Sequence, residues 1–463
     1  MKGFDVPGLA IGIVAGNKLV YAKGLGFRSK GGPRVDTQTL FQIASVTKAF
    51  LSTTMAIAVD RGKLHWDDRI VDLDPEFQLR DPWVTREFRV FDLMAQRSGL
   101  PPYANEFLTL LGFDRSARIR SLRYVDPVSS FRSTFAYTNT THILAGRIVA
   151  RAEGAADWNA VLQSEILDPL GMKNTTYSAA AMTASANHAV GHRYTVDGSV
   201  EAPLDPFPYE GDGAGDINSN IEDMAKWVSL QLANGALDGR QIVSPANLVY
   251  TRTPKVAISD KAFYALGWVV QQTPNGDIVF HSGITNGFAA IVALQLDRNL
   301  GVIVLSNQSG FGMTGDVLGL WTLDRLLGNP MVDHAATALA GAKTRYADEL
   351  KQFARPADPQ PSPPLAPLAG NFANPAFGKA ALRMDGVTAT LEFAATGAKL
   401  RLDPWNGAVY TATLAPEEKF AAIVANLGPL PIALAQFQND KDGKLNTLRL
   451  TLSDGQAYDF KRE

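Results

Sequence analysis

The sequence predicts an α+β fold in which helices flank one antiparallel β-sheet, a large and mostly helical insertion interrupts that sheet, and a small all-β barrel follows. Three observations predict it. Apolar residues alternate with smaller ones over 7–29 and again over 264–306, which indicates strands. Between these segments, over 41–253, apolar residues recur with helical spacing. A proline-rich stretch at 354–368 then separates this part from a region of short strands.

The elements of the first part follow from these patterns. The opening segment is expected to form a β-hairpin because Gly16-Asn17 supplies a tight turn between two alternating runs. From Phe41 to Val59 we expect a helix that is apolar or small on nearly every face and therefore buried. The closing strands are predicted at 264–271, 278–281, 288–296 and 301–306. Helices at 319–327 and 334–354 are expected to cover the sheet.

The C-terminal part has a different composition. Six prolines fall within the fifteen residues from Ala354 to Leu368, so this stretch is expected to be a stiff, extended linker. Beyond it lie seven short strand-like runs separated by turns such as Asp385-Gly386, a pattern that favours a small antiparallel barrel or sandwich. We therefore expect a first domain at 1–353, a linker at 354–368 and a β-barrel domain at 369–463.

Composition excludes several classes of function. The chain carries 44 Lys and Arg against 46 Asp and Glu, a net charge of 44 − 46 = −2, so no nucleic-acid partner is expected. The absence of cysteine excludes disulfides, thiolate nucleophiles and CxxC metal sites. No stretch reaches the roughly 20 apolar residues that cross a bilayer, so no membrane span is expected. The first residues hold no signal-peptide core, so we expect a periplasmic or secreted location if a signal was removed and a cytoplasmic one otherwise.

The predicted helix at 41–59 carries the first candidate site. Lys48 is its only charge, and a buried lysine is costly unless it is paired or deprotonated. Burial lowers a lysine pKa and so favours a neutral amine that can accept a proton. Ser45 lies three residues earlier, on the same helical face and at the helix N-terminus, where backbone N–H groups favour negative charge. This pair could supply a nucleophile and its base, but a serine at a helix start is also a common N-cap.

Two further motifs carry chemistry. Tyr137-Thr138-Asn139 precedes a helical run, and a tyrosine beside a lysine can shuttle protons. A second Tyr-x-Asn, Tyr103-Ala104-Asn105, leaves the choice between the two open at this point. His281-Ser282-Gly283 ends a predicted strand, where the glycine lets a substrate backbone approach and the N–H of Ile284 could bind an oxyanion.

Taken together, the three motifs resemble those of the penicillin-recognising serine hydrolases. Their order is the same, and the separations from Ser45, 137 − 45 = 92 and 281 − 45 = 236 residues, are similar too. More closely, the chain resembles the class C β-lactamase-like branch, with its D,D-carboxypeptidases, D-aminopeptidases and esterases. Gln96-Arg97-Ser98-Gly99-Leu100-Pro101 is similar to the Ser-Gly-Leu-Pro loop of that branch. Because Tyr103 follows this loop too closely, the resemblance favours Tyr137.

The resemblance implies roles for the matched residues. Ser45 would be the acylated nucleophile, with Lys48 as its general base and Tyr137 as the proton shuttle. Asn139 would hold the substrate amide, and His281 would line the far wall of the site. Ser282 and Gly283 would contact substrate there, and the backbone N–H groups of Ser45 and Ile284 would form the oxyanion hole. No metal and no organic cofactor are implied.

Three departures from the family pattern matter. His281 stands where the β-lactamases of this branch usually have lysine, and a mostly neutral imidazole anchors a substrate carboxylate less strongly. Ile284 stands where small residues are frequent, so its side chain could narrow the acyl pocket, depending on its direction. The chain also opens directly on a strand, where the family usually has a helix that packs on the sheet.

We therefore expect a serine hydrolase that acts through an acyl-enzyme on peptide-like amide bonds, with D-amino-acid peptides among its candidate substrates. One alternative is a carboxylesterase with weak or no β-lactamase activity, and another is a non-catalytic penicillin-binding or sensor protein. A metalloenzyme based on His188, His192 and Asp197 is a weaker alternative because no general base lies next to them.

The expected partner is a small-molecule or short peptide substrate. The C-terminal region resembles, through Leu368-Ala369-Gly370-Asn371-Phe372 and its strand spacing, the lipocalin-like barrels appended to some family peptidases. A homo-oligomer formed through this β-domain is therefore open.

Overall fold

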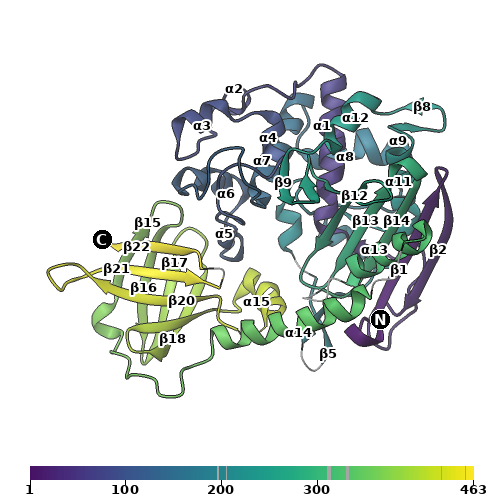
Figure 1. The fold of residues 1–463 in the computed structure, drawn as a ribbon. Helices are drawn as coiled ribbons and strands as arrows, with labels where there is room; N and C mark the ends of the chain where they lie inside the picture. Colours follow the sequence, from purple (N-terminus) through teal and green to yellow (C-terminus); the bar gives the residue numbers. More distant parts are fainter. Residues whose placement is uncertain (196–197, 205, 310–313, 330–332, 429, 454) are drawn as a thin grey trace. The chain divides into compact units, whose positions relative to one another are not determined.

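The structure is a computed structural model that describes residues 1–195, 198–204, 206–309, 314–329, 333–428, 430–453 and 455–463 (Figure 1). It consists of two compact units. The first comprises Met1–Ala104 and Val125–Ala342, and the second comprises Asn105–Tyr124 and Lys343–Glu463. The second unit therefore includes a segment of twenty residues that interrupts the first.

An antiparallel sheet forms the centre of the first unit. Its strand order is β2-β1-β14-β13-β12-β11-β10-β9, and every neighbouring pair is antiparallel. The strands of this sheet are β1 Gly8–Ala15, β2 Lys18–Gly26, β9 Val256–Ser259, β10 Ala262–Tyr264, β11 Val269–Gln271, β12 Ile278–Ile284, β13 Ala289–Gln295 and β14 Leu300–Ser306.

Short strand pairs and helices complete the first unit. The paired strands are β3 Phe41–Gln42 with β6 Asn218–Ser219, β4 His192–Thr195 with β5 Gly198–Glu201, and β7 Ala236–Leu237 with β8 Arg240–Gln241. The α-helices are α1 Thr47–Asp60, α2 Ile70–Leu73, α3 Pro82–Glu87, α4 Val90–Met94, α7 Asn139–Glu153, α8 Trp158–Leu162, α9 Asp168–Leu170, α10 Ala179–Ala184, α11 Ile221–Leu232, α12 Pro245–Arg252 and α13 Thr314–Leu327. The 3₁₀ turns are η1 Lys2–Phe4, η2 Ala44–Val46, η5 Phe207–Glu210 and η6 Leu296–Arg298, and η4 Gln163–Leu167 is a π-helical turn.

The two faces of the sheet are covered by different helices (Figure 1). On one face, Leu323 of α13 packs with Val302 and Val304 of β14 and with Ile291 of β13. On the other face α11 approaches so closely that a Cβ at Gly301 would lie 2.5 Å from Val228. Since side chains alternate along a strand, β13 and β14 present one row of side chains to α13 and the other row to the opposite face.

Most of the sheet agrees with the sequence prediction, and the α+β fold class is confirmed. The opening hairpin is present as β1 and β2, and three of the four closing strands occur where they are expected. The predicted strand at 264–271 is wrong, because two short strands, β10 and β11, replace it. Gly267 breaks the run: its φ is +76°, and a Cβ there would lie 2.5 Å from the carbonyl oxygen of Lys48. Strand β9 has no counterpart among the predicted strands.

The predicted helix at 41–59 starts later than expected. Phe41 and Gln42 pair with Ser219 and Asn218 as a two-stranded ladder, and η2 then carries Ser45 before α1 begins at Thr47. The hydrogen bonds of this tertiary pairing outweigh the local helical pattern. Lys48 keeps its expected place in the first turn of α1.

The second unit is a closed barrel of eight antiparallel strands, as the fold-class prediction requires. Phe372 and Arg462 pair to join the first strand to the last. Its interior is filled by buried apolar side chains that include Phe393, Leu400 and Leu450. The strands are β15 Gly370–Asn374, β16 Gly378–Asp385, β17 Thr388–Phe393, β18 Lys399–Asn406, β19 Val409–Leu414, β20 Ala433–Asn439, β21 Leu445–Leu452 and β22 Ala457–Arg462. Its helices are α5 Phe107–Leu110, α6 Arg115–Ser121 and α15 Ala421–Leu427, with the turns η3 Leu122–Tyr124, η7 Ala366–Leu368 and η8 Glu418–Phe420.

Two other segments belong to the second unit. The segment 105–124 contributes Phe107 and Phe113, whose rings lie 6.1 Å from that of Phe377 in the barrel core. The proline-rich stretch lies along the barrel, where the N–H of Gly407 donates to the carbonyl of Gln360 over 3.0 Å. Helix α14, His334–Gln352, begins in the first unit and ends in the second. The division of the chain into a first domain at 1–353, a linker at 354–368 and a barrel domain at 369–463 stays a prediction.

Candidate active site

Three side chains predicted from separate motifs meet at Ser45. The Lys48 Nζ lies 2.9 Å from the Ser45 Oγ, and the Tyr137 hydroxyl donates to the same oxygen over 2.9 Å. Asn139 is joined to them, since its Oδ1 accepts from Lys48 Nζ over 2.6 Å. The structure therefore brings together the first two motifs, 92 residues apart (137 − 45), around one hydroxyl.

Lys48 is fully buried, and its hydrogen-bond partners determine how its amine uses its N–H groups. Besides Ser45 and Asn139, the carbonyl of Ala214 accepts from Nζ over 2.6 Å. A carbonyl and an amide oxygen can only accept, so both take N–H groups of the amine. A neutral amine has two N–H groups for these two acceptors and a lone pair for the Ser45 hydroxyl. The arrangement therefore suits a lysine that accepts the serine proton.

The backbone around Ser45 is strained. Ala44, the residue before it, has φ +49°, a left-handed conformation that costs a non-glycine residue about 1–3 kcal/mol. Strand β12 also passes very close to η2: a Cβ on Gly283 would lie 2.1 Å from the Ile43 oxygen and 2.9 Å from the Ser45 nitrogen. Only glycine fits there, so Gly283 brings the third motif against the backbone of Ser45.

The loop that follows α4 holds the Tyr137 motif in place. Gln96 is buried, and its carbonyl accepts from the N–H of Ala136 over 2.9 Å while its Oε1 accepts from the N–H of Thr138 over 2.6 Å. The N–H of Tyr103 donates to the carbonyl of Tyr137 over 2.7 Å. Hydrogen bonds thus fix the backbone at Tyr137 and on both sides of it.

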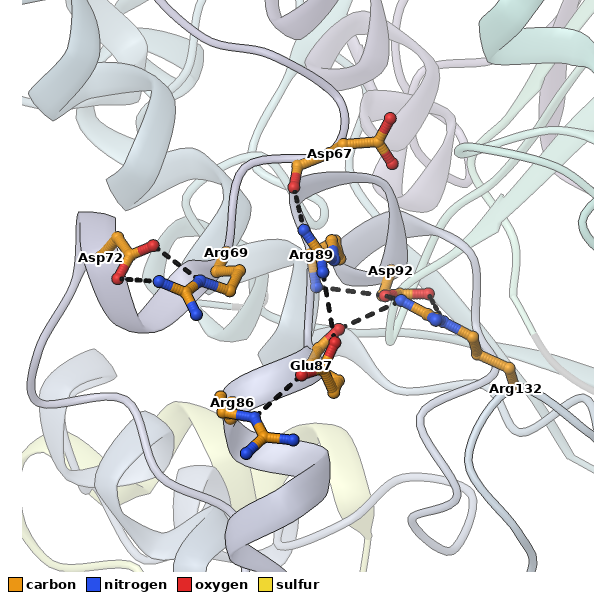
Figure 2. A network of polar contacts seen from close by, with 8 residues as sticks. All are labelled: Asp67, Arg69, Asp72, Arg86, Glu87, Arg89, Asp92 and Arg132. Atoms are coloured by element: carbon orange, nitrogen blue, oxygen red, sulfur yellow. Dashed lines mark hydrogen bonds and ion pairs between the residues drawn. The ribbon is translucent and has the colours of Figure 1, made fainter.

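A charged network surrounds Asp92 of α4, the helix that precedes this loop (Figure 2). Asp92 is buried at its centre and accepts from Arg132, with a shortest contact of 2.6 Å, and from Arg97 at 3.2 Å. The hydrogen bond to Asp92 raises the pKa of Arg132 above its ordinary value, against the opposing effect of burial. Arg89 extends the network to Glu87 and to the carbonyl of Asp67. Asp92 therefore ties the segment around 97 to the segment around 132.

His281 lies in the aromatic wall of the site. Its Nδ1 is 2.6 Å from the carbonyl of Ser282, so Nδ1 carries the hydrogen and Nε2 accepts from the Tyr264 hydroxyl over 2.9 Å. Burial is the largest cause that lowers the pKa of His281, to about 3. Burial raises the pKa of Tyr264. His281 is thus neutral at ordinary pH and has a partner at each ring nitrogen.

The side chains of Ser282 and Ile284 lie on the face of the sheet opposite to Ser45. Alternation along β12 places Ser282 and Ile284 with Phe280, which packs on the α13 side, whereas His281 and Gly283 share the side of Ser45. Ser282 hydrogen-bonds Asp316 of α13, and this bond opposes the burial that raises the Asp316 pKa to about 7. Ile284, 47% exposed, therefore does not narrow the pocket at Ser45.

Two residues of the metalloenzyme alternative, His188 and His192, have backbone partners of their own. The Nδ1 of His188 lies 2.6 Å from the Ser185 carbonyl, and that of His192 lies 3.1 Å from the Asn307 carbonyl. Asp197 lies outside the described residues. Within the ranges that the structure describes, no group of three or more His, Asp or Glu side chains is placed to hold a metal ion. In those same ranges no helix is long and apolar enough to span a membrane.

Several residues of the site escaped the sequence analysis. The Ala214 carbonyl acts through its backbone, so no side-chain pattern could reveal it. Tyr264 lies in a run that reads as an ordinary strand, and only its pairing with His281 marks it. Gln96 belongs to the loop Gln96–Pro101, but its hydrogen bonds to the Tyr137 motif depend on its left-handed backbone, φ +55°.

Comparisons with known proteins place the chain in a family. A profile of the beta-lactamase family matches residues 1–325, and a profile described as a domain of unknown function, DUF3471, matches residues 354–462. Unguisins hydrolase ungD' of Aspergillus campestris is 28% identical over 408 residues, 81% of this chain and 74% of the relative. Unguisins hydrolase ungD of Aspergillus violaceofuscus is 26% identical over 466 residues, 90% and 81%. Protein flp of Staphylococcus aureus is 24% identical over 306 residues, 65% and 60%.

A solved structure agrees with these matches. The octameric penicillin-binding protein homologue from Pyrococcus abyssi superposes with a TM-score of 0.63 at 20% identity, covering 100% of this chain and 97% of its own. That likeness shows the fold. The family profile spans 325 of the 463 residues and contains all three motifs, so the chain belongs to the beta-lactamase family of serine hydrolases.

Proposed function

We propose that this chain is a serine hydrolase that cleaves peptide-like amide bonds through an acyl-enzyme on Ser45. The observation that carries the proposal is the meeting of Lys48 and Tyr137 at the Ser45 hydroxyl, both at 2.9 Å. A nucleophile needs a base within hydrogen-bond reach, and both candidates satisfy that requirement. A protein that only bound its ligand would not need either group there.

The proposed reaction follows the proton positions. Lys48 takes the Ser45 proton as the oxygen attacks the scissile carbonyl, and the Tyr137 hydroxyl hands its proton to the leaving amine. Lys48, now carrying three hydrogens, returns one to Tyr137, and water then attacks the acyl-enzyme by the reverse route. The backbone N–H groups of Ser45 and Ile284 would stabilise the oxyanion.

Two features support an uncharged substrate group beside the third motif. His281 is neutral, so it offers no positive charge to a carboxylate. The side chain of Asn139 is likewise an uncharged amide, and its Oδ1 accepts from Lys48. This chemistry favours a peptidase or amidase over an efficient β-lactamase. The names of two relatives describe them as hydrolases, which agrees with turnover.

A turnover panel tests the proposal. It comprises p-nitrophenyl acetate, a D-Ala anilide, a D-Ala-D-Ala peptide and a chromogenic cephalosporin, each with wild type and Ser45→Ala. Ser52→Ala is the matched control, because Ser52 is buried on the same helix and donates to Ala49 instead. We expect Ser45→Ala to lower turnover at least about 1,000-fold and Ser52→Ala to leave it near wild type.

The panel also separates the alternatives. Turnover of the ester alone would favour a carboxylesterase, and a stable adduct without turnover would favour a penicillin-binding or sensor protein. Activity that survives Ser45→Ala would contradict the proposal. Assembly through the C-terminal barrel also stays a proposal. Light scattering of the purified chain measures its oligomeric state.

A further inference from the structure

Tyr103 has an unusual position for a large aromatic side chain. Its backbone donates to Tyr137, and its ring centroid lies 5.7 Å from that of Tyr137 at an interplanar angle of 50°. The Tyr137 hydroxyl touches the Ser45 oxygen at 2.9 Å. Tyr103 is therefore one ring away from the group that attacks the substrate.

The ring is exposed and its backbone is strained. Tyr103 is 49% exposed, and its φ of +55° lies in the left-handed region. Burying an aromatic ring is favourable, and a left-handed backbone costs a non-glycine residue about 1–3 kcal/mol. Strain that persists beside a reacting group, together with an exposed ring, points to contact with a ligand.

The wall beyond Tyr103 is aromatic and uncharged. Tyr264 lies 6.3 Å from Tyr137, Phe135 lies 5.5 Å from Tyr264, and the neutral His281 lies 5.8 Å from Tyr264, all between ring centroids. In this row Tyr103 is the exposed member: Phe135 and Tyr137 are partly buried, and Tyr264 and His281 are buried. A planar group on the substrate would find its stacking surface at Tyr103.

We propose that Tyr103 is a specificity-determining residue that stacks on an aromatic group next to the scissile bond of an uncharged substrate. The inference rests on the proposed function and deepens it by naming a substrate class. Offset or edge-to-face contacts of a second ring with Tyr103 would stabilise the bound substrate and the transition state together. The preference should therefore be expressed mainly in KM.

Thioesters make the test clean, because the chain has no cysteine and a thiol-reactive dye then reports only the released thiol. Each turnover consumes one water, breaks the C–S bond and releases one acid and one thiol. Two pairs of substrates are compared: ethyl thioacetate with its phenylacetyl analogue, and ethyl thioacetate with phenyl thioacetate. The first pair places a ring on the acyl side and the second on the leaving side.

The readout is the ratio of kcat/KM for the aromatic substrate to that for ethyl thioacetate. We expect Tyr103→Ala to lower this ratio about tenfold in at least one pair, mainly through KM, and Tyr103→Phe to restore it to within about twofold. Tyr21→Ala, which removes a 45% exposed ring on β2, is the control and should leave both ratios unchanged.

Two results would overturn the inference. One is that Tyr103→Ala leaves the ratio of kcat/KM values unchanged in both pairs. This includes the case in which the variant hydrolyses all substrates more slowly by the same factor. The other is a ratio that Tyr103→Phe fails to restore although the variant melts at the wild-type temperature. Failure of the proposed function would look different, because Ser45→Ala would then still hydrolyse ethyl thioacetate.

Discussion

Replacing Gly283 by alanine should disable the site, because the added Cβ forces β12 away from the turn that carries Ser45. A Cβ at this position would lie 2.1 Å from the Ile43 oxygen, whereas real Cβ atoms essentially never come nearer than 3.0 Å. Strand β12 and η2 must therefore separate by at least 3.0 − 2.1 = 0.9 Å. Since η2 carries Ser45, the substitution changes the geometry of the nucleophile and of the proposed oxyanion hole together.

The magnitude follows from this displacement. A misplacement of about 1 Å at a reacting centre costs roughly 100-fold in rate. Overpacking should also lower the free energy of unfolding by about 1–3 kcal/mol. We therefore expect kcat on p-nitrophenyl acetate to fall about 100-fold, and the rate of Ser45 labelling by a fluorophosphonate to fall with it.

Gly215→Ala is the matched control. It also borders Ala44, but its Cβ would lie 3.7 Å from the nearest atom, an ordinary van der Waals contact. This variant should keep kcat within about threefold of wild type, because no neighbouring atom has to move to make room for the added Cβ. The reasoning fails if Gly283→Ala stays within threefold of wild type, or if Gly215→Ala loses as much activity.

Three further predictions concern charge. Asp316→Asn should raise the free energy of unfolding at pH 8 by about 1–3 kcal/mol. The pKa of Asp316 is about 7 in the folded protein against 3.8 for an ordinary aspartate, so the wild-type protein becomes less stable as pH rises from 4 to 7, and an asparagine does not titrate. Urea titrations at pH 5 and pH 8 check this, and equal effects at both pH values would contradict it. Asp92→Asn should lower the free energy of unfolding, measured in urea, by about 3 kcal/mol because it breaks a buried ion pair. The control is Asp72→Asn, which removes an exposed ion pair with Arg69 and should lower it by under about 1 kcal/mol. Because His281 is neutral, a D-Ala-D-Ala peptide and its C-terminal amide should have kcat/KM values within about threefold, and a tenfold preference for the free acid would refute that.

The sequence was most informative where chemistry and chain geometry coincide. Ser45 and Lys48 are three residues apart, so their proximity survived even though Ser45 lies on a 3₁₀ turn and not on the predicted helix. The hairpin and most sheet strands follow from alternation and turn chemistry alone. The fold class was predictable for the same reason.

What the sequence could not show depends on long-range contact. Whether the Ile284 side chain points toward Ser45 is decided by the pleat of β12, which only its partner strands establish. The assignment of 105–124 to the barrel unit is equally hidden, because Phe107 and Phe113 read locally as an ordinary helical pattern. The place of Tyr264 in the site is visible only from its hydrogen bond with His281.

The central claim is that Ser45 forms the covalent intermediate, and mass spectrometry tests it most directly. Wild-type protein is acid-quenched during turnover of p-nitrophenyl acetate, digested and mapped. We expect one added acetyl group on the peptide that contains Ser45, which disappears when the substrate is exhausted and is absent from Ser45→Ala. Turnover without that adduct, or an adduct on another residue that decays at the turnover rate, would contradict the account.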